Sequence, residues 1–207
     1  MPAPLTVSVV NPKGGTGKTT IAVHLAVASH RSGYPTKLLD TDPQGTALDW
    51  RRQTPEGYDG PPVEHVPADE KVAPAVQGAD VVMIDSPARL DERTGAVLSV
   101  SDLALVPVRP SGLDLWGTAE FLDVLEEHTA GALSAAFVAS QRDVRTTLSD
   151  ELERELSELG LPLLEGLTSR VAYPRSMSQG ETVLDGYDAT AAKEVRVLLE
   201  DMGSLLS

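Results

Sequence analysis

The stretch NPKGGTGKTT, at positions 11–20, decides the fold of this chain. The common phosphate-binding loop reads G-x-x-x-x-G-K-[ST], and GKT at positions 17–19 matches the end of that pattern. The pattern requires a glycine at position 12, where the chain has Pro12, and it does not require the second lysine, Lys13. These two departures raise the question of what a phosphate-binding loop gains from a proline and an additional cation.

The segments on either side of this loop are those that phosphate binding requires. An apolar run, Leu5–Val10, predicts a strand before the loop, and the pattern of Gly17–Ser32 predicts a helix after it. The loop glycines let backbone N–H groups turn inward, and the helix directs the positive end of its dipole to the same point. Lys18 would then reach the β- and γ-phosphates, and the Thr19 hydroxyl would ligate Mg²⁺. A glycine-rich turn that binds nothing is the alternative, and the order of strand, loop and helix argues against it.

The composition of the chain fits one domain of ordinary size. The chain has 207 residues, of which 41% are hydrophobic, and no run approaches the ~20 apolar residues of a membrane span. The N-terminus lacks the basic region of a signal peptide. The absence of cysteine excludes disulfides and cysteine-held metals or clusters, and the four histidines show no ligand spacing. We expect one domain over residues 1–207, located in the cytoplasm.

The charge of the chain is strongly acidic, with 31 acidic residues against 17 basic ones and a formal net charge of −14. An acidic balance normally argues against nucleic-acid binding, because contacts to phosphates require local cations. Lysine is scarce, and two lysines nevertheless lie in the one loop at positions 11–20. The chain therefore concentrates lysine at its predicted phosphate site.

Short apolar runs alternate with longer amphipathic ones along the whole chain. Strands are expected at Leu5–Val10, Thr36–Asp40, Val63–Val66, Asp80–Asp85, Leu103–Val108, Leu133–Ala139 and Leu163–Thr168. Helices are expected at Gly17–Ser32, Thr46–Gln53, Glu70–Gln77, Asp91–Ser101, Leu113–His128, Thr147–Leu159 and Ala189–Leu206. Continuously apolar strands are typical of a parallel sheet with helices on both faces. We therefore predict an α/β fold with a single doubly wound, mostly parallel sheet.

Carboxylates follow two of the predicted strands. The segment DTDPQG places Asp40 and Asp42 at the end of a buried strand, where carboxylates are costly unless a cation meets them. Mg²⁺ and a positioned water are the natural partners, while helix capping and turn formation at Asp42 are the alternative. The segment VVMIDSPA contains the end of the other strand, at Asp85, in the Walker B arrangement in which a carboxylate holds a water on Mg²⁺.

Together these segments resemble the deviant Walker A ATPases of the ParA/MinD group, which are P-loop nucleoside triphosphatases. KGGTGKTT matches the loop KGGxGK[ST] of that group, and DTDPQG and VVMIDSPA match its second and third motifs. LVPVRPSGLD and the late GETVLD extend the resemblance along nearly the whole chain. The layout is most similar to the short plasmid-partition ParA subgroup, whose members lack an N-terminal helix-turn-helix.

The resemblance implies a role for the additional lysine. Lys13 is expected to cross a dimer interface and contact the nucleotide of the partner subunit, so that two ATP molecules lie between two protomers. Such a cation delivered in trans stabilises charge on the phosphate oxygens. We infer that Pro12 stiffens the backbone that presents Lys13.

The resemblance also implies the remaining site residues. The catalytic residues would be Lys13, Lys18 and Asp42, of which Asp42 orients the attacking water. Nucleotide contacts would come from Lys13, Gly14, Gly15, Thr16, Gly17, Lys18, Thr19 and Thr20. Adenine contacts would come from Gln141 or Arg142, and from Arg170 with Val171. Mg²⁺ would be held by Thr19, Asp40, Asp42 and Asp85. The implied cofactors are ATP or ADP and Mg²⁺.

The leading functional hypothesis is a DNA-segregation ATPase. Its ATP-bound homodimer would bind DNA of the nucleoid without sequence preference, and a ParB-like centromere-binding partner would stimulate turnover. Candidate DNA contacts are Arg142, Arg145, Arg170, Arg175, Lys193 and Arg196, although acidic residues lie among them and a solvated surface is the alternative.

Two other functions use the same ATPase. The first is the positioning of a protein cargo, such as a carboxysome or a chemoreceptor cluster, through a cargo adaptor. The second is a MinD-like spatial regulator, and such relatives end in a basic amphipathic helix that binds membranes. This chain carries Glu194, Glu200 and Asp201 near its end, so an anionic membrane would repel it. We expect no membrane partner.

Overall fold

The computed structural model of the chain describes residues 3–109, 115–129, 133–143, 156 and 159–206. The strands are β1 (Leu5–Val9), β2 (Thr36–Asp40), β3 (Val63–His65), β4 (Val81–Asp85), β5 (Leu103–Val108), β6 (Ser134–Arg142) and β7 (Leu163–Thr168). The helices are α1 (Lys18–Arg31), α2 (Thr46–Gln53), α3 (Val72–Ala75), α4 (Glu92–Leu98), α5 (Leu115–Thr129), α7 (Ala172–Met177) and α8 (Ala189–Ser204).

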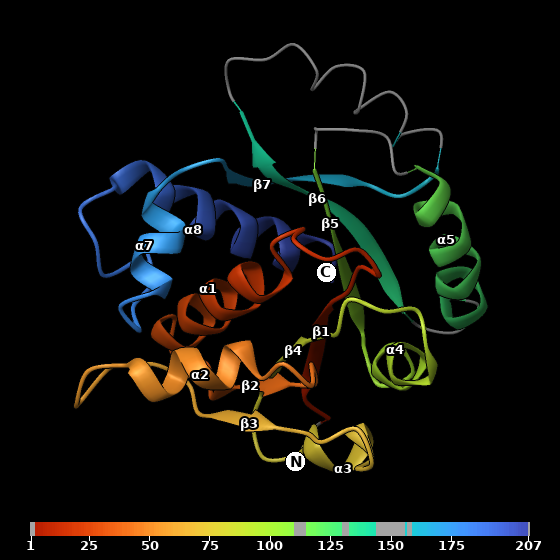
Figure 1. Cartoon of the computed structure of the whole chain (residues 1–207), viewed down its shortest axis with the longest axis horizontal. Coiled ribbons are helices and arrows are strands. Elements are labelled where there is room, and N and C mark those ends of the chain that lie inside the picture. The colour runs from red at the N-terminus through yellow and green to blue at the C-terminus, as the bar shows by residue number, and fades with distance from the viewer. Residues whose placement is uncertain (1–2, 110–114, 130–132, 144–155, 157–158, 207) are drawn as a thin grey trace.

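The strands form a seven-stranded sheet in the order β3-β2-β4-β1-β5-β6-β7, and every neighbouring pair is parallel. This arrangement confirms the predicted α/β fold. β1 lies between β4 and β5, so the strand order reverses at β1. Ligands of such sheets bind outside the carboxyl ends of the strands, at this reversal. The loop at positions 11–20 follows β1 and therefore lies at that place (Figure 1).

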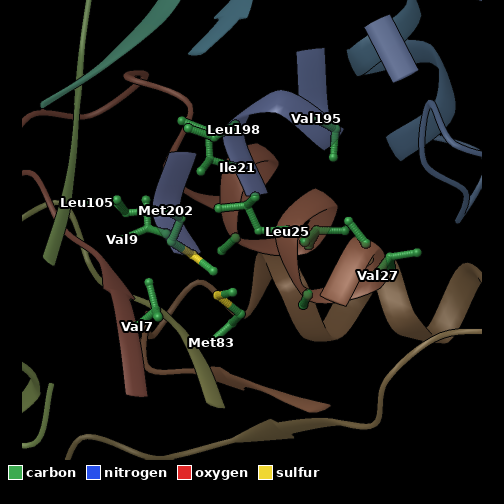
Figure 2. Close-up of a cluster of buried hydrophobic side chains, with 14 of the residues drawn as sticks. Val7, Val9, Ile21, Leu25, Val27, Met83, Leu105, Val195, Leu198 and Met202 are labelled. Atoms are coloured by element: carbon green, nitrogen blue, oxygen red, sulfur yellow. The ribbon is translucent and has the colours of Figure 1, made fainter. Parts of the chain in front are cut away.

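Helices cover both faces of the sheet, as Figure 1 shows with α1, α7 and α8 on one side and α4 and α5 on the other. The first core packs α1 and α8 against β1, β4 and β5, and Figure 2 shows Ile21 and Leu25 of α1 in one cluster with Val9 of β1 and Leu198 of α8. The second core includes Phe121, and it packs α4 and α5 against the opposite face. Because both faces are covered, the strands are apolar throughout rather than alternating.

Several elements differ from the prediction, among them α4, which is shorter than the predicted Asp91–Ser101. The helix α7 was not predicted, because it is a short element of six residues that contains Pro174. The helix α3 is shorter than the predicted Glu70–Gln77. The strand β6 is longer than the predicted Leu133–Ala139, since it continues beside β7 as far as Arg142. The predicted helix Thr147–Leu159 lies mostly outside the described residues.

Gly180 is a position where the fold requires glycine. Its φ is 68°, and a methyl group there would lie 2.3 Å from the carbonyl carbon and oxygen of Gln53. We expect Gly180→Ala to lower the free energy of unfolding by about 3 kcal/mol, from overpacking and the left-handed backbone together. Gly160→Ala is the matched control, because Gly160 has a φ of 75° and a methyl group there would meet no atom of the described residues within 4 Å. It should cost about 1 kcal/mol in denaturant titration, and equal losses for the two variants would contradict the packing account.

The buried His24 joins α1 to the segment that carries the GETVLD sequence. Its Nε2 accepts a hydrogen bond from the Val183 N–H at 3.2 Å, so the ring proton lies on Nδ1, which donates to the Thr20 carbonyl at 2.7 Å. Burial lowers the pKa of His24 to about 4, although its bond to Thr20 and the charge of Asp185 oppose that shift. The folded state therefore holds this histidine in its neutral form.

A pH dependence of stability follows from this lowered pKa. The unfolded chain takes up the His24 proton near pH 6.5, whereas the folded chain takes it up only near pH 4. The free energy of unfolding should therefore fall by about 3 kcal/mol from this group as the pH drops from 6.5 to 4. In denaturant titrations across that range, His24→Gln should lose this slope. Val27→Ala, a buried change on the same helix, should shift stability equally at every pH. A slope that persists in His24→Gln would contradict the assignment.

Candidate functional site

The loop between β1 and α1 needs glycine at two positions because of its backbone conformation, and at one of them also because of a close contact. Gly15 has a φ of 75° and Gly17 a φ of 90°, both in the left-handed region that favours glycine. A methyl group on Gly17 would also lie 2.7 Å from the Ser140 hydroxyl of β6. The end of β6 therefore packs closely against the loop. The sequence pattern did not indicate this contact.

Asn11 fixes the start of the loop. Its side-chain oxygen accepts a hydrogen bond from the Lys13 N–H at 2.8 Å, and its side-chain nitrogen donates to the Pro107 carbonyl of β5 at 2.7 Å. The first bond closes a turn around Pro12, a geometry that asparagine followed by proline favours. Pro12 and Asn11 together set the direction in which the backbone reaches Lys13.

The two lysines of the loop occupy different environments. Lys18 is 7% exposed, and its ammonium group donates to the Lys13 carbonyl at 3.2 Å. Burial lowers the pKa of Lys18, against the opposing charges of Asp85 and Asp42. Lys13 is exposed at the outer side of the loop. One lysine is thus buried within the loop, while the other lies at the surface.

Asp85 is the most unusual acid of the site. It is fully buried, and neither of its carboxylate oxygens has a hydrogen-bond partner among the described residues. Burial raises the pKa of Asp85 to about 8, and the nearby Thr19 hydroxyl and Lys18 ammonium oppose this shift while Asp40 adds to it. A buried carboxylate without partners is costly, and a cation removes that cost. The environment of Asp85 fits a hydrated Mg²⁺.

The metal would need ligands beyond the protein. Within the described ranges, no group of three or more histidine, aspartate or glutamate residues could hold a metal ion. Mg²⁺ in phosphate sites keeps several waters and is bound through one or two carboxylates together with phosphate oxygens. The pair of Thr19 and Asp85 suits that mode.

Asp40 and Asp42 both accept backbone hydrogen bonds. The carboxylate of Asp40 is buried and accepts the Asp42 N–H at 3.1 Å and the Leu48 N–H at 2.9 Å, so it stabilises the start of α2. Burial raises the pKa of Asp40, which these two N–H donors oppose. Asp42 is half-buried and accepts the Gln44 N–H at 2.9 Å in a turn. The turn and capping roles are therefore present, and the metal roles of both residues stay predictions.

Side chains outside the predicted set hold the carboxylate loops in place. The Thr41 hydroxyl donates to the Asp85 carbonyl at 2.8 Å, which joins the end of β2 to the end of β4. The Ser86 hydroxyl donates to the Val9 carbonyl at 2.9 Å, which joins β4 to β1. These bonds fix the relative positions of the strand ends that carry Asp42, Asp85 and the loop.

The remaining loop residues lie between β1 and the first turn of α1. Thr16 is buried, and its hydroxyl donates to the Lys13 carbonyl at 3.4 Å. A methyl group on Gly14 would lie 4.0 Å from Ala88, so the loop after β4 borders the phosphate loop. Thr20 is half-buried on the first turn of α1.

Two of the candidates for adenine contact, Gln141 and Arg170, have other partners in this structure. Gln141 has a φ of 55°, and its side-chain amide donates to the Gly15 carbonyl at 3.0 Å. The Arg170 guanidinium lies 3.0 Å from Glu194 and 3.8 Å from Asp188. Arg142 is half-buried at the end of β6. Their adenine roles stay predictions, and the ion pairs of Arg170 were not predicted.

The candidate DNA contacts are spread over separate elements. Arg175 on α7 is exposed, as are Lys193 and Arg196 on α8. Arg170 is held by its acidic partners, and Arg145 lies outside the described residues. DNA binding stays a prediction.

A family model for the CobQ/CobB/MinD/ParA nucleotide-binding domain matches residues 7–183. The chain belongs to this family. The match begins in β1 and includes the three loops that follow β1, β2 and β4. The predicted ParA/MinD resemblance is thereby confirmed.

Relatives with this domain have several functions. The chain is 30% identical over 211 residues to the maintenance of carboxysome distribution protein A of Halothiobacillus neapolitanus, which covers 95% of both chains. It is 29% identical over 185 residues to the chromosome-partitioning ATPase Soj of Thermus thermophilus, which covers 72% of this chain and 74% of that protein.

Solved structures with the same fold contain nucleotides. A plasmid partition protein from Borrelia burgdorferi bound to AMPPNP superposes with a TM-score of 0.78 at 15% identity, covering 97% of this chain and 99% of that chain. MinD from Pyrococcus horikoshii with Mg-ADP has a TM-score of 0.75 at 18% identity, covering 99% and 98%. Among the described helices of the present chain, none has the length and apolar character needed to cross a membrane.

Proposed function

We propose that this chain is a Mg²⁺-dependent ParA-type ATPase that hydrolyses ATP to ADP and phosphate, with residues 1–207 forming one ATPase domain. The observation that carries the proposal is the buried Asp85 carboxylate, which lacks hydrogen-bond partners among the described residues and lies beside Lys18 and Thr19. A phosphate loop with a buried cation suits a Mg-nucleotide when a buried acid beside it has no hydrogen-bond partner among the described residues. The nucleotide-bound solved relatives support the same ligands.

The residues of the loop would divide the work of binding and hydrolysis. Backbone N–H groups of residues 14–17 and the Lys18 ammonium would bind the phosphates. Thr19 and Asp85 would hold Mg²⁺, either directly or through waters bound to the metal. The bound metal neutralises charge on the phosphate oxygens. Asp42 would orient the attacking water, since it follows the neighbouring strand β2 and its charge reaches Lys18.

We propose further that ATP joins two copies of the chain, with Lys13 of each copy contacting the nucleotide of the other. Lys13 is exposed, whereas Lys18 is buried within its own subunit. A second lysine at the surface of the same loop is able to contact a nucleotide bound by the other protomer. ATP binding and dimer formation would then be coupled, because each nucleotide contacts both protomers.

The cellular role we propose is the positioning of a cargo along DNA, with an adaptor that stimulates turnover. A plasmid or chromosome cargo with a ParB-like adaptor is supported by the similarity to Soj and to the protein ParA of Rhizobium radiobacter. A protein cargo of the carboxysome type is comparably supported, because the relative from Halothiobacillus neapolitanus is similar over 95% of both chains. Genes adjacent to this one would distinguish the two cargoes.

The test of the ATPase dimer is a comparison of molecular mass by size exclusion with light scattering. The nucleotide-free and ADP-bound protein should be monomeric, and the ATP- and AMPPNP-bound protein should be dimeric in the presence of Mg²⁺. The ATP dimer should decay with phosphate release, whereas the AMPPNP dimer should persist. A monomer in all four states would overturn the dimer proposal, and an absence of ATP binding would overturn the ATPase proposal.

DNA binding needs a separate measurement, because the chain is acidic. Binding to a random-sequence duplex should require ATP and should weaken as salt rises, since phosphate contacts release counterions. The exposed Lys193 and Arg196 on α8 are the variants to test first. The absence of binding at every salt concentration would remove the proposed movement along DNA. Co-sedimentation with anionic vesicles tests the MinD-like alternative, and we expect no association.

A further inference from the structure

The carboxyl end of β6 has an irregular backbone beside the phosphate loop. In the pairing of β6 with β7, Ser140 lies opposite Leu167 and Arg142 lies opposite Thr168, so Gln141 is an additional residue in β6. Its φ is 55°, and it is the one residue other than glycine with a positive φ among those that the structure describes. Bulges and left-handed backbones of this kind persist where the surroundings require them.

The bulge places two side chains of β6 against the phosphate loop. The Gln141 amide donates a hydrogen bond to the Gly15 carbonyl at 3.0 Å. The Ser140 hydroxyl lies so close to Gly17 that only a glycine fits there. The hydrogen bond from Gln141 to Gly15 joins residues 126 positions apart in the sequence. The bulge therefore influences the conformation of the phosphate loop.

The hydrogen bond to Gly15 has a consequence for the next residue. The peptide bond is planar and trans, so the Gly15 carbonyl and the Thr16 N–H point in opposite directions. A donor that holds the carbonyl on the β6 side turns the Thr16 N–H to the other side of the loop. Backbone N–H groups of a phosphate loop bind the ligand only when they point inward.

We propose that Gln141 is a positioning residue of the phosphate loop, which holds the Gly15 carbonyl so that the Thr16 N–H is directed at the phosphates before the nucleotide arrives. This inference rests on the proposed nucleotide site, and it assigns to Gln141 a role in phosphate binding in place of contact with adenine. The two roles make different predictions for ligands that lack a base.

The test compares Mg-ATP, Mg-tripolyphosphate and adenosine as ligands of Gln141→Met, which keeps the length of the side chain and removes its donor. Positioning predicts that the affinities for ATP and tripolyphosphate fall together, by about threefold to tenfold, while that for adenosine stays unchanged. Gln179→Met, at an exposed glutamine on another part of the chain, is the matched control and should change none of the three. A loss confined to ATP and adenosine would overturn the proposal in favour of base contact, and unchanged affinity for all three would also overturn it.

A second variant separates the amide from the backbone strain. Gln141→Gly relieves the left-handed conformation and lacks the amide, so it should raise the midpoint of thermal unfolding and still weaken tripolyphosphate binding as Gln141→Met does. Normal binding by Gln141→Gly would show that the amide is dispensable and would overturn the proposal.

A third readout requires no ligand. The amide signal of Thr16 in the ¹H–¹⁵N spectrum of the nucleotide-free protein should shift in Gln141→Met, while signals from the far end of α1 stay unchanged. An unshifted Thr16 signal would contradict the positioning role. If the wild-type protein fails to bind Mg-ATP, the proposed function falls, and this spectrum still decides whether Gln141 sets the geometry of the loop.

Discussion

Replacing Lys13 with alanine is expected to leave ATP binding within about fivefold of the wild type and to abolish the ATP-dependent dimer. Lys13 is exposed, and its backbone carbonyl is what holds Lys18 and Thr16 within the loop. The substitution removes a side chain and keeps that carbonyl, so the subunit's own pocket should survive. A cation supplied to a phosphoryl group by a neighbouring molecule is worth about 10³–10⁵ in turnover, and hydrolysis should fall by about 10³-fold.

The measurements are nucleotide affinity by fluorescence titration, molecular mass by light scattering, and phosphate release. Lys18→Ala is the contrasting variant, because Lys18 is buried and we propose that it binds the phosphates within its own subunit. It should lose ATP affinity by about tenfold to hundredfold, since hydrogen bonds to charged groups are strong. Lys71→Ala, at an exposed lysine before α3, should behave as the wild type. If Lys13→Ala forms normal dimers with ATP, Lys13 is not needed to contact the nucleotide of the other protomer, and the proposal is contradicted.

Most of the fold could be predicted because its signals are local. The apolar runs of β2 and β7 matched the structure, and the glycine-rich loop placed the start of α1 within one residue. Buried strands of a parallel sheet carry continuous apolar sequence, which a short window detects. The helix α7 escaped prediction because six residues around a proline give too little periodicity.

The parts of the site that the sequence did not predict depend on contacts between distant segments. The bulge at Gln141 arises from the pairing of β6 with β7, and its contact is with Gly15. Likewise, Arg170 lies beside Glu194 because α8 packs against β7, and no local pattern indicates that ion pair. Asn11 lies inside the predicted loop, yet its bond to Pro107 depends on the sheet order that places β5 beside β1. A motif thus identifies which residues meet the ligand, and tertiary structure determines how they are held.

Replacing Asp42 with asparagine is expected to reduce ATP hydrolysis by about 10²–10⁴-fold and to leave ATP binding and dimer formation intact. Asp42 is half-buried at the end of β2, and its charge reaches Lys18 of the phosphate site. Its carboxylate also accepts the Gln44 N–H at 2.9 Å, so a change at this position can alter the turn as well as the chemistry. Asparagine keeps an oxygen that can accept from Gln44 and removes the negative charge that orients the attacking water.

Asp42→Ala removes both the charge and the acceptor, and the two variants together separate the two roles of Asp42. If Asp42 acts on the attacking water, both variants should form ATP dimers with long lifetimes and release phosphate slowly in a single turnover. If Asp42 acts only by closing the turn with Gln44, Asp42→Asn should hydrolyse ATP normally and Asp42→Ala alone should fail. Asp49→Asn, at an exposed acid of α2, should leave hydrolysis unchanged. Since ATP would hold the protomers together, slow phosphate release with stable dimers would identify Asp42 as the residue that sets the lifetime of the paired state.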